Sequence, residues 1–197
     1  MLIEIAVGVA AAAVTTVVAR VLWARRNRAA EATPAPAAAA APVRGPGLHP
    51  GDVLSGLGQE LVLEAGSELD DGGFVLRVLE VVSTRPRHIV QLDVEGEVLV
   101  LAEPTTDVPA GRVADVMEVG GRVLGLVRRG HAVARPVRAD RPPARWPSGA
   151  ALSGGVEIVV LADRAGRSLI VLDAGPERLA LRGDRLDRRQ LDLLPGS

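Results

Sequence analysis

The residues that most often carry enzyme chemistry are few in this chain and widely spaced. The chain has no cysteine, so disulfides, thiolate nucleophiles and cysteine-ligated zinc or iron–sulfur sites are excluded. Its histidines are His49, His88 and His131, and none has a partner at the H-x-H or H-E-x-x-H spacing that places two imidazoles on one metal ion. Ser148 and Ser153 lie in a Gly- and Pro-rich stretch, but the chain has no G-x-S-x-G nucleophile motif. The sequence therefore predicts no catalytic, cofactor-binding or metal-binding residue.

Clustered carboxylates offer another route to chemistry. The stretch ELDDGG at residues 68–73 lacks the alternating ligands and the closing glutamate of an EF-hand calcium loop. We interpret it as a solvated turn that leads into a strand at Phe74. A pair of carboxylates can do acid–base work without histidine, and Asp93 and Asp173 lie at predicted strand ends. An enzyme built on carboxylates and arginines is therefore the alternative to a non-enzymatic protein.

One segment carries an excess of positive charge. Between residues 128 and 145 six arginines accompany one acid, Asp140, whereas residues 48–197 as a whole hold 18 arginines and 22 acids. Such a segment is a candidate contact surface for phosphate headgroups or for an acidic protein partner. The alternative is a solvated connecting loop whose tryptophan packs on the core. The candidate contact residues are Arg128, Arg129, Arg135, Arg138, Arg141, Arg145 and Trp146.

The elements that position these residues begin with an apolar N-terminal stretch. Residues 2–23 contain two charged side chains, Glu4 and Arg20, and a helix of that length reaches about 33 Å, enough for a hydrocarbon core of about 30 Å. Trp23 and a cluster of arginines follow the apolar run, whereas a secretory signal has its positive charge before the run. We therefore predict a retained transmembrane anchor over residues 1–26. A cleaved signal peptide and a soluble amphipathic helix are the alternatives.

The anchor predicts a single-pass protein of the inner or cell membrane. Because the arginine cluster follows the span, the positive-inside rule places the N-terminus outside and the following domain in the cytoplasm. Gly8, Ala12 and Thr16 form a small-xxx-small pattern, so a homodimer through the anchor is a further hypothesis. The formal net charge of -1 gives no overall positive field, and no nucleic-acid partner is expected.

The chain after the anchor divides into a linker and one domain. Residues 27–47 are rich in Ala and Pro and predict a disordered linker. Residues 48–197 form a β-rich domain, in which a Pro/Gly-rich loop at residues 138–155 joins two halves. The second half, residues 154–197, is too small for a core of its own, so we expect it to complete the sheet of the first half.

The domain shows strand-like patterns at roughly ten-residue spacing. HIVQLDV at residues 88–94 alternates between two faces, and Gly120-Gly121 and Ala165-Gly166 each separate two strand-like runs, as in β-hairpins. DRRQLDLLPG at residues 187–196 predicts a helical turn or a terminal edge strand. The pattern predicts an all-β fold, a small barrel or a sandwich, preceded by one transmembrane α-helix and a disordered linker.

The opening and closing segments of the domain resemble a known family. LHPGDVL at residues 48–54 resembles the Leu-x-x-Gly-Asp opening of a family of bacterial β-rich domains of unknown function. LRGDRLDRRQLDLLPG at residues 181–196 is similar in style to the closing segments of that family. The resemblance covers about the 150 residues after the linker. The resemblance implies a domain of short paired strands, and it implies no catalytic residue in this chain.

These observations favour a membrane-tethered, non-enzymatic interaction or scaffold module whose cytoplasmic β domain docks an unidentified protein partner. The support is the anchor, the spacer and the scarcity of catalytic groups. The alternatives are the carboxylate and arginine enzyme and a secreted or periplasmic binding domain released by signal cleavage.

Overall fold

The computed structural model describes residues 47–56, 58–92, 98–137 and 155–196. Within these ranges the protein is all-β apart from one 3₁₀ turn, which confirms the predicted class. The elements are β1 (Val53–Gly56), β2 (Gln59–Asp71), β3 (Phe74–Val81), β4 (His88–Leu92), β5 (Val98–Pro104), β6 (Val116–Val119), β7 (Arg122–Pro136), β8 (Val156–Ala162), β9 (Arg167–Asp173), β10 (Arg178–Leu186), η2 (Arg188–Gln190) and β11 (Leu191–Leu194).

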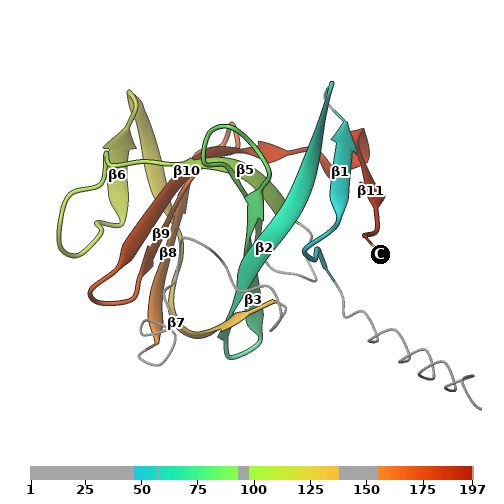
Figure 1. Cartoon of the computed structure of the whole chain (residues 1–197). Helices are drawn as coiled ribbons and strands as arrows, with labels where there is room; N and C mark the ends of the chain where they lie inside the picture. The colour runs from blue at the N-terminus through green and yellow to red at the C-terminus, as the bar shows by residue number, and fades with distance from the viewer. Residues whose placement is uncertain (1–46, 57, 93–97, 138–154, 197) are drawn as a thin grey trace, which may run out of the picture. The chain divides into compact units, whose positions relative to one another are not determined.

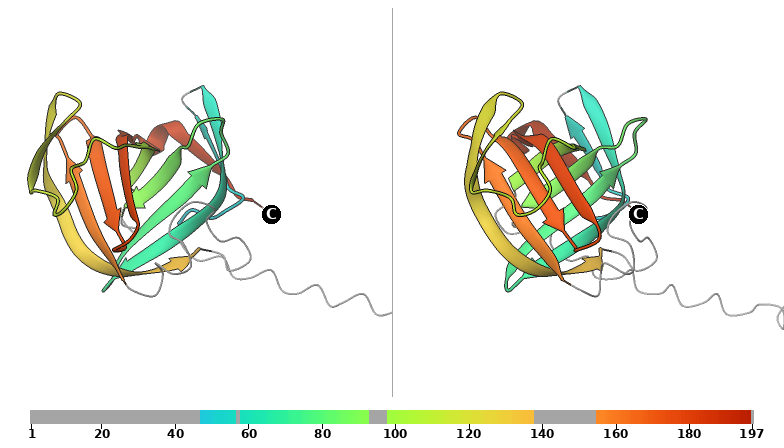
Figure 2. Two further views of the ribbon diagram at one scale, coloured as in Figure 1. Left: turned by 60° about the vertical axis from the view of Figure 1, so that its left-hand side comes forward. Right: turned by 90° about the vertical axis from the view of Figure 1, so that its left-hand side faces the viewer.

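Eight antiparallel strands close into a barrel (Figure 1). Neighbouring strands pair in the order β2-β3-β4-β5-β10-β9-β8-β7, and a further pairing between β2 and β7 closes the ring. The closing register runs from Ser67 opposite Pro136 to Asp70 opposite Val133. Figure 2 shows β7, in yellow, curving along the bottom of the view toward β2, in teal. Of the two predicted architectures, the structure is the barrel.

The strands on both sides of residues 138–154 belong to this one ring. β7 pairs with β8, and β5 pairs with β10. The interior apolar cluster accordingly draws on both parts of the chain, with Leu76 and Val90 from the first and Ile158 and Ile170 from the second. Each part therefore supplies strands and side chains to a single core.

Aliphatic side chains fill the barrel interior. An eight-stranded barrel leaves an interior just wide enough for side chains. The interior combines branched residues such as Val100 with small ones, Ala102, Ala132 and Ala134. Phe74 packs against one part of this cluster. A core of this kind suits a chain whose aromatic content is 2%.

Two further layers cover parts of the barrel's outer surface. β1 pairs with β11 and β2, and a second apolar cluster beneath these strands includes Leu54, Leu79, Ile89 and Leu99. A third cluster lies between β6 and the outer faces of β8 and β9, where it includes Leu169. Because several strands are buried on both faces, they read as continuous apolar runs rather than as strict alternation.

The turn predicted over residues 68–73 is shorter than expected. β2 continues through Asp71, and only Gly72 and Gly73, both with positive φ, form the turn before β3. The prediction was wrong for Glu68 and Asp70, because arginines on neighbouring strands pair with these carboxylates within the sheet. At the other end of the chain, residues 187–196 form both predicted alternatives, a 3₁₀ turn and an edge strand.

The predicted anchor over residues 1–26 and nearly all of the predicted linker over residues 27–47 lie outside the described residues. Among the residues that the structure describes, no helix has the length and apolar character needed to span a membrane.

Candidate functional site

The histidines lie on separate elements. His49 precedes β1, His88 is buried in β4 and His131 is exposed on β7. Across residues 47–56, 58–92, 98–137 and 155–196, no three or more His, Asp or Glu side chains gather in a way that could hold a metal ion.

The two aspartates considered for an enzyme are not brought together as a described pair. Asp173, at the end of β9, accepts a hydrogen bond from Arg178 Nε at 2.8 Å. The same guanidinium donates to the carbonyl oxygens of Pro109 and Gly111, so the pair holds the segment before β6 on the barrel. Asp93 lies outside the described residues.

Arg128, the first of the predicted contact residues, points toward one end of the barrel interior. Its Nη2 donates to Asp71 Oδ2 at 2.6 Å, and its guanidinium carbon lies 3.9 Å from the centroid of the Phe74 ring. Its Nε is buried and has no hydrogen-bond acceptor among the described residues. The ion pair and the cation–π contact therefore fix this guanidinium against the wall of the barrel.

Arg129, the next predicted contact residue, faces the outside of the barrel and bridges two acids. It donates to Asp115 at 3.0 Å, to Glu157 at 2.9 Å and to the Val113 carbonyl oxygen at 2.7 Å. The hydrogen bonds to Asp115 and to Glu157 raise the pKa of Arg129 above its ordinary value, although desolvation acts in the opposite direction.

Arg135 belongs to a network at the closing seam of the barrel. It donates to Glu68 at 3.1 Å and to Asp70 at 3.2 Å. Glu68 also accepts two hydrogen bonds from the buried Arg77, at 2.9 and 2.7 Å, and Arg77 donates to the Leu48 carbonyl oxygen at 3.2 Å. This network joins β2, β3 and β7 to the segment before β1.

The described part of the predicted contact segment thus pairs with acids of the same barrel. Arg138, Arg141, Arg145 and Trp146 lie outside the described residues, so contact of the segment with lipid or with an acidic partner stays a prediction.

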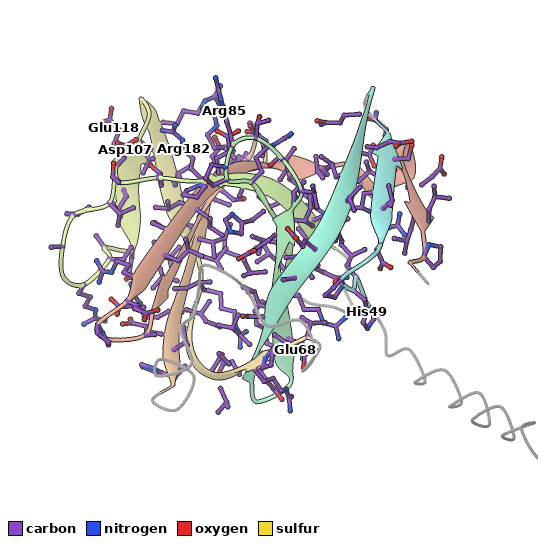
Figure 3. All side chains as sticks on the ribbon, viewed as in Figure 1. His49, Glu68, Arg85, Asp107, Glu118 and Arg182 are labelled. Atoms are coloured by element: carbon purple, nitrogen blue, oxygen red, sulfur yellow. The ribbon has the colours of Figure 1, made fainter. Side chains whose placement is uncertain are left out.

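Arginine–carboxylate pairs recur over the barrel surface. Figure 3 labels one such pair, Arg182 and Asp107, whose Nη1 and Oδ2 atoms are 3.0 Å apart. Among the described residues, nine arginines have a carboxylate oxygen within 4.0 Å: Arg77, Arg87, Arg122, Arg128, Arg129, Arg135, Arg167, Arg178 and Arg182. Most of the described arginines therefore pair with a carboxylate, whereas Arg85, Arg112, Arg164, Arg185 and Arg189 make no ion pair with a described carboxylate.

Three of these five arginines line one groove, which we call the arginine groove. It is formed by residues 163–166, the turn between β8 and β9, and by residues 185–189, the end of β10 and η2, and it encloses about 710 Å³. Arg164, Arg185 and Arg189 line it, are exposed, and make no ion pair with a described carboxylate. Arg188 also lines the groove, where it donates to the Leu191 carbonyl oxygen at 3.0 Å.

The two aspartates of the arginine groove are engaged by their own turns. Asp163 accepts a hydrogen bond from the Arg167 backbone N–H at 2.9 Å and pairs with Arg122 at 3.5 Å. The backbone hydrogen bond is the largest cause that lowers the pKa of Asp163 below its ordinary value of 3.8. Asp187 caps η2 by accepting from the Arg189 backbone N–H at 3.0 Å. Both carboxylates stabilise the loops that present the arginines.

A second cavity, the mouth pocket, adjoins the arginine groove at one end of the barrel. It encloses about 470 Å³, and its polar lining includes Arg128 and the buried Ser168. Asp163, Gly166 and Arg185 line both cavities. The apolar lining comes from five strands and consists of Phe74, Leu92, Val98, Val127, Val160 and Ala162.

No protein family, curated protein or solved structure matches this chain. The resemblance of its opening and closing segments to a bacterial family therefore carries no argument about function.

The arginine groove was missed by sequence reasoning because its two parts are distant in the chain. The backbone N–H of Arg185 donates to the Gly166 carbonyl oxygen at 2.9 Å, and this bond brings the β8–β9 turn beside the end of β10. The available signal was the density of arginine around two predicted turns, in ADRAGR at residues 162–167 and in RLDRR at residues 185–189. Only the pairing of β9 with β10 shows that these two runs are neighbours.

Proposed function

We propose that this protein is a non-enzymatic interaction module, held at a membrane by its predicted N-terminal anchor, whose barrel binds an anionic group in the arginine groove. One observation carries the proposal: Arg164, Arg185 and Arg189 line one groove without an ion pair to a described carboxylate, whereas nine other described arginines have such a pair.

The charge of the surroundings supports an anionic ligand. The described residues hold 15 arginines and 18 acidic residues, so the barrel is acidic overall. The arginine groove reverses this balance, with four arginines against two aspartates. An anion bound in the groove is attracted by the positive charges of the arginines that line it. A guanidinium offers a planar fork of donors that matches phosphate and carboxylate oxygens.

The state of the groove's carboxylates supports binding over catalysis. A general acid or base must lie within reach of a substrate proton and must exchange its own proton near the working pH. The pKa of Asp163 is lowered by its hydrogen bond to the Arg167 backbone, so this carboxylate stays ionised at neutral pH. Asp187 is engaged in capping η2. Both carboxylates therefore have structural roles.

The test of the anion site is a titration of the full chain, in phosphatidylcholine nanodiscs, with methyl phosphate as the probe. A variant with Arg164→Gln and Arg189→Gln is expected to bind methyl phosphate about 30-fold more weakly, because each of the two lost charge-assisted hydrogen bonds contributes on the order of 1 kcal/mol. Dissociation constants come from NMR titration.

The matched control for this titration carries Arg85→Gln and Arg112→Gln. Both of these arginines are exposed, lie outside the arginine groove and make no ion pair with a described carboxylate, so the control loses the same net charge. We expect its dissociation constant to stay within about twofold of that of the unaltered chain. Equal weakening in both variants, or the absence of saturable binding, would contradict the proposed site.

The predicted anchor has a separate test. The full chain is expected to remain in membranes washed with alkaline carbonate. A variant with Val9→Arg and Ala13→Arg is expected to appear in the supernatant, because each arginine at the centre of a span costs about 2.5–3.5 kcal/mol. Extraction of the unaltered chain by carbonate would exclude a retained anchor, and an intact mass that lacks the N-terminal segment would identify a cleaved signal peptide.

A further inference from the structure

The arginine groove is continuous with the mouth pocket, and this arrangement indicates the chemical class of the ligand. Arg185 lines both cavities, so a molecule whose anionic group contacts this side chain can extend into either of them. The lining of the arginine groove is dominated by charged residues, whereas the mouth pocket offers Phe74, Leu92 and Val98 as apolar walls. A charged surface and an apolar cavity thus meet at Asp163, Gly166 and Arg185.

The mouth pocket suits a small apolar group. Its volume of about 470 Å³ falls within the range of about 300–1,000 Å³ that is typical of small-molecule sites. Its own cation, Arg128, is already paired with Asp71 at 2.6 Å and stacked on Phe74, so little uncompensated charge faces the cavity from that side. Ala162 leaves space that a larger side chain would fill.

We propose that the ligand is an anionic amphiphile, with a phosphate or carboxylate head in the arginine groove and a single alkyl chain in the mouth pocket. This inference rests on the proposed function and names the ligand class of the same site. The head forms charge-assisted hydrogen bonds with Arg185 and its neighbours. The alkyl chain is removed from water by the apolar walls, which strengthens binding about fourfold for each methylene group buried.

Three probes separate the contributions of head and chain. Methyl phosphate carries the head alone, hexanol carries the chain alone, and hexyl phosphate carries both. In NMR titrations of the full chain in phosphatidylcholine nanodiscs, with empty nanodiscs as the blank, hexyl phosphate is expected to bind about 60-fold more tightly than methyl phosphate, which corresponds to burial of about three methylene groups. Hexanol is expected to bind more weakly than hexyl phosphate.

Two variants place the chain in the mouth pocket. Ala162→Leu fills the cavity, and Val98→Thr adds a hydroxyl to its wall with little change in shape. Both are expected to reduce the preference for hexyl over methyl phosphate at least fivefold while leaving methyl phosphate binding within about twofold. Val123→Thr, at an exposed position on β7 outside the pocket, is the matched control and is expected to keep the full preference.

The outcomes distinguish this inference from the proposed function. If methyl phosphate binds through the arginine groove but hexyl phosphate binds less than threefold more tightly, the amphiphile inference is wrong and the anion site stands. An unchanged preference in both Ala162→Leu and Val98→Thr also overturns the inference. Absence of methyl and hexyl phosphate binding contradicts both proposals.

A further comparison identifies the source of the amphiphile. The titration is repeated in nanodiscs that contain phosphatidylglycerol. Weaker apparent binding of hexyl phosphate there shows that an anionic membrane lipid competes for the site, whereas unchanged binding shows that the site takes a free amphiphile. Either result supports an amphiphile site, provided that the preference for the alkyl chain is present.

Discussion

Replacing Glu68 with glutamine is expected to lower the free energy of unfolding of the barrel by about 3 kcal/mol. Glu68 accepts two hydrogen bonds from Arg77, whose side chain is 8% exposed. A neutral amide keeps the shape of the carboxylate but removes the negative charge that contacts the buried guanidinium. Removing one partner of a buried pair costs much more than the pair contributes, because the remaining charge stays desolvated.

The control for Glu68→Gln is Arg135→Gln. Arg135 binds the same carboxylate at 3.1 Å, but its side chain is 58% exposed. Exposed ion pairs contribute about 1 kcal/mol or less, so this variant is expected to lose no more than that. Urea denaturation of residues 46–197, which form a compact unit of their own, measures both changes. Equal losses in the two variants would show that burial of Arg77 does not matter.

Gly183→Ala is the second substitution expected to have a large effect, with a loss of about 3 kcal/mol in the free energy of unfolding. A Cβ atom at this position would lie 2.2 Å from the Leu101 carbonyl oxygen and 2.7 Å from the Ala102 Cα. Gly183 pairs with Ala102 across β10 and β5, so both contacts are with the backbone of the neighbouring strand. The strands must separate to admit a methyl group, and the ring of hydrogen bonds is strained where they do.

Gly125→Ala is the matched control for this position. Gly125 lies in β7 without a positive φ, and a Cβ atom added there would meet no other atom within 4 Å. Its replacement is expected to change the free energy of unfolding by less than about 1 kcal/mol, since alanine loses less chain entropy than glycine. If both alanine variants unfold at the same urea concentration as the unaltered domain, the close approach of β10 to β5 is contradicted.

The apolar strands could be predicted from the sequence because their signals are local. Runs such as the one at residues 156–162 are short, rich in valine and isoleucine, and bounded by turn residues. Gly120 and Gly121 have positive φ at the tip of the β6–β7 hairpin, as a tight turn requires. Whether the strands would form a barrel or a sandwich was beyond such reasoning, because the closing contact of β2 with β7 joins residues more than 60 positions apart.

β2 and the arginine-rich second part of β7 were not predicted as strands, for a physical reason. β2 contains several carboxylates and β7 several arginines, and each run taken alone resembles a solvated loop. In the barrel these side chains neutralise one another across the strands, as Glu68 and Arg135 do. Charged side chains that would make an isolated strand unfavourable form stabilising pairs with opposite charges on the neighbouring strand. A single sequence does not show which distant run supplies the partner.

The candidate site illustrates the same limit. From the sequence, the segment from Arg128 to Trp146 was a candidate contact surface, with a solvated connecting loop as the alternative, because arginines are concentrated there along the chain. The structure gathers arginines in space from two shorter runs, around Arg164 and Arg185, that are linked by a backbone hydrogen bond. The arginines that are dense along the chain, Arg128, Arg129 and Arg135, pair with acids of the barrel itself. Three of the arginines that share the groove make no ion pair with a described carboxylate.

The most direct test of the arginine groove observes the arginines themselves. The Nε–H resonances of the full chain in phosphatidylcholine nanodiscs are followed by NMR as methyl phosphate is added. We expect the resonances of Arg164, Arg185 and Arg189 to show the largest shifts, with one common dissociation constant. The resonances of Arg85 and Arg112 are expected not to shift. Shifts confined to Arg138, Arg141 and Arg145 would contradict the proposed site and would assign anion binding to the candidate segment identified from the sequence.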